Sequence, residues 1–181
     1  MIRWILQRAA RRFGRRYQYD VSYMLDTIEA SPKAGVRALL YSAAVGYPGP
    51  PAAGEVVLGA SLASILDGDC GPCTQLVIDM GLEAGASPER LRACVQGQQD
   101  LAGDIGLGHD FARAIIAGTP NAEGLAQEIT RLYGRQALVA ASFAAASTRF
   151  YPVFKRGLGH GATCTRVRIG ELEAMVVNAA K

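Results

Sequence analysis

Cysteine, histidine and tryptophan are scarce in this chain of 181 residues, which contains four cysteines, two histidines and one tryptophan. Four cysteines in a chain of this length do not make the disulfide framework of a small secreted protein. The first apolar run, residues 4–6, is too short for a secretory signal. We therefore expect a cytoplasmic protein in a reducing compartment.

Long uncharged helical runs are also lacking. The longest one near the C-terminus, residues 136–148, is too short to span a bilayer, so nothing here requires a membrane. Half of the residues are hydrophobic, which excludes disorder and supplies a substantial core. We expect one domain of common size that needs no cofactor.

Acidic residues are absent before Asp20, whereas six arginines precede it, at positions 3, 8, 11, 12, 15 and 16. The rest of the chain holds 13 basic and 16 acidic residues, which argues against a nucleic-acid-binding body. Apolar residues from Ile2 to Tyr17 recur at helical spacing, so this segment is a predicted amphipathic helix. We expect its apolar stripe to dock on the protein or a neighbouring subunit; contact with a membrane surface or nucleic acid is the alternative.

Serine, proline and glycine residues at positions typical of helix starts and ends predict an all-α organisation. Ser31-Pro32 and Ser87-Pro88 each place an N-cap before a first-turn proline. Helices are expected over 31–46, 56–67, 70–85, from 87 onward, over 104–118 and 119–134, and from 136 to a kink near Pro152. The tail should contain a short extended stretch, 163–169, and a last helical turn, 171–177. We divide the chain into a basic amphipathic helix with its connector (1–30), a helical domain (31–162) and a tail packed on it (163–181).

Cys70 and Cys73, in the run Asp69-Cys70-Gly71-Pro72-Cys73, are the strongest chemical signal. Two thiols three positions apart at a helix start can interconvert between dithiol and disulfide. The unpaired amides of a helix N-terminus lower the pKa of a thiol, whereas the charge of Asp69 opposes that effect. Inert packing and half of a metal site are the alternatives. A zinc site lacks a second pair, because the remaining candidates show no ligand spacing: Cys94, Cys164, His109 and His160.

With these motifs placed, the chain resembles the alkylhydroperoxidase D-like or carboxymuconolactone decarboxylase superfamily. The resemblance covers about residues 35–160 and rests on the order of its motifs: Cys70-x-x-Cys73, residues 74–77 and 83–85, residues 87–91, residues 111–114 and residues 138–152. It implies an all-α fold assembled as trimers or hexamers. It also implies reduction of a peroxide or another oxidised substrate, with Cys73 as the attacking thiolate, Cys70 as the resolving thiol, and a dithiol protein as reductant.

The proton relay of that superfamily is missing here. Active members carry a glutamate about twelve residues before the first cysteine and histidines around and after the second; this chain has Leu58, Pro72 and Val77 there. General acid–base help is typically worth about 10²- to 10⁴-fold, so turnover should be reduced or differently supported. Glu55, one helical turn from the missing glutamate, and His160 are the candidate substitutes.

Plainer interpretations stand beside these candidates. Glu55 is also typical of an acidic residue at an ordinary helix start. His160 is typical of an ordinary loop, unless the C-terminal segment folds over the dithiol and brings His160 or Cys164 to it. His109 is expected on the surface or in packing. Another group, formed by Arg149, Tyr151 and Lys155, could bind an anion. The simpler explanation is that cations at a helix end interact with its terminal carbonyl groups.

Three functions remain from these observations. The leading hypothesis is a thiol-dependent, peroxidase-like oxidoreductase. The second is a noncatalytic or redox-sensing member with a structural dithiol, which the missing relay favours. The third is lactone decarboxylase or isomerase chemistry, against which the dithiol weighs. The pair Gly71-Pro72 matches thioredoxin, whose βαβ setting is absent here; the proline favours a reducing poise.

Overall fold

The computed structural model describes residues 1–161 and 166–176, and this part of the chain is mostly helical. The elements in order are α1 (Ile2–Tyr17), α2 (Ser22–Ala30), α3 (Pro32–Val45), α4 (Gly54–Asp67), α5 (Gly71–Glu83), α6 (Pro88–Val95), α7 (Asp104–Ala117), α8 (Ala122–Tyr133), α9 (Arg135–Ser147), α10 (Phe150–Gly157), β1 (Arg166–Ile169) and β2 (Leu172–Met175), with short 3₁₀ turns at Pro51–Ala53 and Gln99–Leu101.

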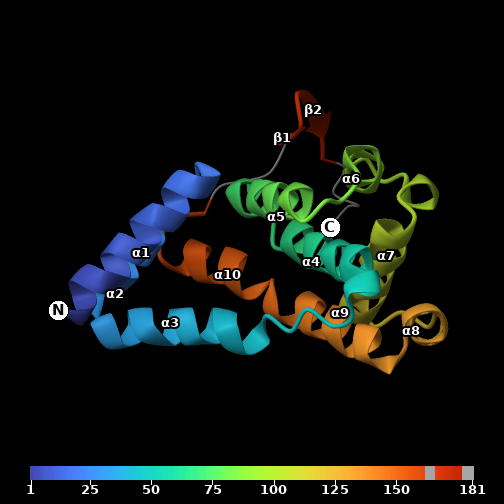
Figure 1. Cartoon of the computed structure of the whole chain (residues 1–181), viewed down its shortest axis with the longest axis horizontal. Coiled ribbons are helices and arrows are strands. Elements are labelled where there is room, and N and C mark those ends of the chain that lie inside the picture. The colour runs from blue at the N-terminus through green and yellow to red at the C-terminus, as the bar shows by residue number, and fades with distance from the viewer. Residues whose placement is uncertain (162–165, 177–181) are drawn as a thin grey trace.

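Helix α4 lies at the centre and packs against α7 and α9 (Figure 1). Small residues allow this closeness, because a Cβ at Gly59 would overlap the carbonyl oxygen of Ile105, and one at Gly108 that of Val56. Two apolar clusters fill the interior on either side of α4. One includes Leu62, Ile78, Leu91 and Ile105, and the other includes Val56, Phe111, Ile129 and Ala141.

The first three helices form a layer of their own at one end of the molecule, away from α6–α8 (Figure 1). A small cluster of Leu6, Ala10 and Ile28 holds α1 on α2, with Val36 of α3 packed against it. Helix α10 extends from α9 toward this layer, where Phe154 meets the ring of Tyr23 edge-on at 6.3 Å. The expected docking of α1 on its own chain is therefore confirmed in part: Leu6 of the apolar stripe is buried, whereas Ile2 and Ile5 are 54% and 52% exposed.

Several predicted helix starts are confirmed by their caps. The hydroxyl oxygen of Ser31 accepts from the Ala34 amide, and that of Ser87 accepts from the Arg90 amide. The helix is interrupted at Thr148 and Arg149, between α9 and α10, which is earlier than the kink expected near Pro152. Pro152 lies in the first turn of α10, where its missing N–H costs no intrahelical hydrogen bond.

The expected last helical turn at 171–177 is wrong. Leu172–Met175 is strand β2, paired antiparallel with β1 across a turn at Gly170, whose φ is +62°. The extended stretch is confirmed over Arg166–Ile169; residues 163–165 lie outside the described part. Val167, Ile169 and Ala174 are buried against the core, because a hairpin pleat alternates its side chains between core and solvent.

The helical segment Arg135–Gly157, which spans α9 and α10, is longer than the run of 13 residues considered above. By length and composition alone it would suffice to cross a membrane. Its inner face is packed within this chain, where Ala137, Ala140 and Ala141 have no exposed surface.

Candidate functional site

Cys70 and Cys73 occupy the first turn of α5. Cys70 is the N-cap, with extended φ and ψ of −126° and 100°, and Cys73 is the third residue of the helix. The two are joined as a disulfide with a Cα–Cα distance of 5.3 Å. The amides of a first helical turn have no intrahelical acceptor, so their partial positive charge favours a thiolate at this position.

Both cysteines are buried, with 2% of their surfaces exposed, in a small cluster with Ile65, Val77 and Tyr151. They differ in what they face. Cys73 lines a cavity of about 1010 Å³, whereas Cys70 is not among its lining residues. Of the two sulfurs, that of Cys73 is therefore the one placed to meet a molecule in the cavity.

This cavity lies between the α1–α3 layer and the helices α4, α5, α9 and α10. Its volume matches that of sites for small organic ligands. The wall is mainly apolar, with residues from several helices, including Leu6, Phe13, Leu39, Val57, Leu76, Met80 and Phe150. A few polar side chains interrupt it, among them Tyr19, Tyr23, Ser42 and Glu55.

Tyr19 stands beside Cys73, and Lys155 stands beside Tyr19. The Tyr19 hydroxyl lies 3.5 Å from the Cys73 Sγ, and the Lys155 Nζ donates to the same hydroxyl oxygen at 3.4 Å. Because an ammonium can only donate, the Tyr19 proton is free to point at sulfur. Lys155, Tyr19 and Cys73 thus form a chain of hydrogen bonds that ends on the Cys73 sulfur.

Lys155 is held by aromatic rings. Its Nζ lies 4.8 Å from the ring centre of Tyr19 and 5.1 Å from that of Tyr23, within range of cation–π attraction. Only 1% of the residue is exposed, and within the described residues it forms no ion pair. Burial lowers the pKa of Lys155 and raises that of Tyr19 to about 12. The ammonium is therefore a stronger acid than that of an exposed lysine.

Local backbone geometry brings Tyr19 to this place. Gln18 ends α1 in the left-handed conformation, with φ of 48°, and the Tyr19 amide donates to the carbonyl oxygen of Gly14. The chain thereby turns inward and buries Tyr19 under α10. The sequence indicates Lys155 only as a candidate for binding an anion, and it does not indicate Tyr19 at all. Neither residue lies in a local motif that would mark it as part of a site.

The two candidate substitutes for the relay have other partners. The Glu55 carboxylate lines the same cavity but accepts from Arg90 at 2.6 Å. The His160 Nε2 lies 2.6 Å from the Asp26 Oδ2. The structure brings neither into a described hydrogen bond with the cysteines. His109 is 4% exposed, in agreement with a packing role.

The remaining thiols are separate from the site. Cys94 is buried in the α6 core, and burial raises its pKa to about 12, which keeps it a protonated thiol. Cys164 lies outside the described residues. Among the described residues, no cluster of three or more histidine, cysteine, aspartate or glutamate side chains could hold a metal ion.

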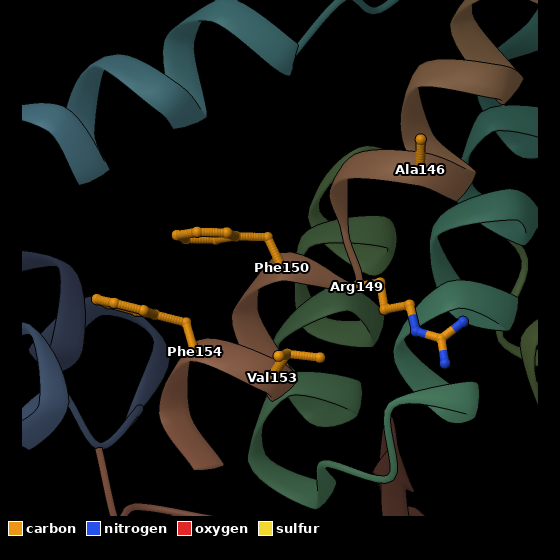
Figure 2. Close-up of a pocket in the computed structure, with 5 residues that line it drawn as sticks. All are labelled: Ala146, Arg149, Phe150, Val153 and Phe154. Atoms are coloured by element: carbon orange, nitrogen blue, oxygen red, sulfur yellow. The ribbon is translucent and has the colours of Figure 1, made fainter. Parts of the chain in front are cut away.

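A second, shallower hollow of about 350 Å³ lies on α9 and α10 (Figure 2). Phe150 and Phe154 project from α10 in the same direction with their rings stacked at 5.1 Å, and both also line the large cavity. Arg149 points the other way and pairs with Asp67 at 2.7 Å. Because a single helical stretch supplies every wall, this hollow does not enclose a ligand.

No protein-family model, curated protein or solved structure matches the chain.

Proposed function

We propose that this protein is a thiol-dependent oxidoreductase of the alkylhydroperoxidase D-like class, which reduces organic hydroperoxides through Cys73 and Cys70. The observation that carries the proposal is the position of Cys73, in the wall of a large apolar cavity and beside the Tyr19 hydroxyl. The order of motifs around the dithiol supports the same class.

The reaction begins with the reduced dithiol. The Cys73 thiolate attacks the terminal peroxide oxygen, the O–O bond breaks, and the products are a Cys73 sulfenic acid and an alkoxide that takes up a proton to become an alcohol. The Cys70 thiol then attacks the Cys73 sulfur, the hydroxyl leaves as water, and the disulfide forms. A dithiol protein returns two electrons and two protons by thiol–disulfide exchange.

Tyr19 and Lys155 are the proton source for the alkoxide. The Tyr19 hydroxyl is the donor nearest to the Cys73 sulfur among the described contacts, and Lys155 can replace the proton that Tyr19 gives up. Because burial lowers the pKa of Lys155, this transfer costs less than from an exposed lysine. The pair takes the part that glutamate and histidine play in the superfamily.

A redox-sensing role is the second candidate. Each of the two cysteines is only 2% exposed, and a thiol reached only through a cavity would be oxidised slowly. In that case the dithiol would form the disulfide once and would not turn over under a dithiol reductant.

Counting thiols in the intact protein tests the proposal. Reduced protein treated with a stoichiometric amount of cumene hydroperoxide should lose two thiols, as measured by alkylation and intact mass. Cys73→Ser should abolish the loss, and Cys70→Ser should stop at a sulfenic acid. The control Cys94→Ser should behave like the wild type, because that thiol is buried elsewhere. Unchanged thiols after long exposure would reject the proposal, and a single slow oxidation without turnover would support the sensor.

Rates test the proton source separately. Tyr19→Phe should slow the oxidation of Cys73 by about 100-fold, a typical loss for one general acid. The matched control is Tyr17→Phe, which removes the same hydroxyl two residues away, where it donates to Glu83 on the surface. Equal rates for the two variants would remove Tyr19 from the mechanism and leave the cysteine chemistry standing.

A further inference from the structure

Helix α1 uses only a narrow stripe to hold its place. Leu6, Ala10 and Gly14 are its buried residues, and they face α2 and α3. Ala9 and Phe13 line the cavity, and the face opposite the buried stripe is exposed. Helix α1 lies at the edge of the molecule with its N-terminus at the outer end (Figure 1). The outward face is therefore accessible to a large partner.

Four arginines make that face strongly basic. Arg8, Arg11, Arg12 and Arg15 are exposed and form no ion pair with any described residue. The other two arginines of α1 are neutralised, by Glu29 and Glu83 respectively. Because no acid occurs before Asp20, nothing on α1 itself offsets the charge. A partner of opposite charge fits this face.

Large apolar side chains stand beside the arginines. Trp4, Ile2 and Ile5 are 62%, 54% and 52% exposed, all within the first turns of α1. The Arg8 guanidinium lies over the Trp4 ring at 5.6 Å. Single exposed apolar residues are ordinary, whereas three together beside a basic row mark an interaction site.

We infer that the outward face of α1 binds an anionic lipid surface, with the helix lying parallel to it. Arginines are attracted to anionic headgroups, and tryptophan and aliphatic side chains favour the boundary between headgroups and acyl chains. Nucleic acid would satisfy the four arginines but gives Ile2 and Ile5 no apolar environment. The inference does not depend on the proposed enzyme activity.

Trp4 provides the measurement, because it is the only tryptophan in the chain. With phosphatidylcholine vesicles that contain phosphatidylserine, we expect the protein to sediment with the vesicles and the Trp4 emission to shift to the blue. Pure phosphatidylcholine vesicles should produce neither effect. Binding should fall away at about 1 M salt, where the Debye length is about 3 Å.

Two variants of equal charge separate this face from general electrostatics. The first replaces Arg8, Arg11, Arg12 and Arg15 by glutamine. The control replaces four exposed arginines on other elements, Arg113, Arg131, Arg135 and Arg168. At about fivefold per arginine, the first variant should lose several hundredfold in partitioning onto the vesicles, and the control should lose far less.

Circular dichroism verifies that both variants are folded. Equal partitioning by the two variants, or an unshifted Trp4 emission on anionic vesicles, would overturn the inference. So would binding to double-stranded DNA without binding to vesicles. A mass in solution that depends on the four arginines, without vesicle binding, would assign the face to a second copy of this chain instead.

Discussion

Lys155 is a charged residue at a position where an apolar one would be cheaper for folding. Taking an ammonium out of water costs several kcal/mol, and cation–π attraction to two rings returns about 0.5–2 kcal/mol. The lowered pKa of Lys155 has the same cause, since burial penalises the charged form. We interpret this stability cost as the counterpart of the proton-donor role that we propose for Lys155.

Replacing Lys155 should therefore raise the stability of the protein and lower its proposed peroxide-reducing activity. We expect Lys155→Met to raise the free energy of unfolding at pH 7 by about 1 kcal/mol, measured by urea denaturation. The exposed Lys33→Met should leave it within about 0.5 kcal/mol of the wild type. A destabilised Lys155→Met would mean that the ring contacts outweigh the burial of charge.

The pH dependence of that difference follows from the direction of the shift. Because the pKa of Lys155 is lowered in the folded state, the unfolded state binds more protons between that pKa and the ordinary value of 10.5. The free energy of unfolding of the wild type therefore rises relative to that of Lys155→Met as pH rises through this window. The gap should be narrower at pH 9.5 than at pH 7; a constant gap would contradict the shift.

At the scale of elements, the crossing of α4 and α7 sets the shape of the core. The Gly59 Cα faces the backbone of Ile105, and the Gly108 Cα faces that of Val56. Since backbone carbonyls cannot turn away as side chains do, a methyl group here would push the helices apart. The crossing holds the middle of α4, the helix that leads into the cysteine turn.

Gly59→Ala should lower the free energy of unfolding by about 3 kcal/mol, because overpacking at a backbone contact exceeds the gain in helix propensity. Gly124→Ala in α8 is the matched control, since nothing lies within 4 Å of the added Cβ. It should gain about 0.5 kcal/mol. Thermal unfolding of the two variants measures both, and a neutral Gly59→Ala would show that the two helices can separate at little cost.

At the scale of the whole molecule, large apolar side chains remain exposed on several helices. Leu39 and Leu40 on α3, and Val139 and Phe143 on α9, are between 40% and 60% exposed. We expect them to be covered in a homo-oligomer, a trimer or hexamer as the superfamily resemblance implies. The α1 helix should not hold the subunits together, because Leu6 and Ala10 already dock on this chain and its outward face is the one inferred to bind lipid.

Light scattering with size-exclusion chromatography checks this expectation. The full chain should have a mass of three or six subunits of 19.1 kDa, and deletion of residues 1–17 should leave the subunit number unchanged. A deleted protein of lower subunit number would place α1 between subunits, and a monomeric full chain would reject the assembly.

Most helices were predictable because their signals are local, although Ser22–Ala30, which was expected to belong to a connector, is helix α2. Apolar residues at helical spacing, and caps such as Ser31 and Ser87, lie within a few residues of what they control. The strand Leu172–Met175 was not predictable, because four residues carry little periodicity and pairing with Arg166–Ile169 decides their conformation.

The dithiol at a helix start and the basic charge of α1 were determined by the sequence itself, since both depend on neighbours along the chain. Tertiary structure alone decided what stands around Cys73. Tyr19 is 54 residues from Cys73, and Lys155 is 136 residues from Tyr19, so no spacing rule connects them. They meet because the α1–α3 layer and α10 bury their apolar faces together, and that packing places the Tyr19 hydroxyl beside the cysteine sulfur that faces the cavity and the Lys155 ammonium beside that hydroxyl.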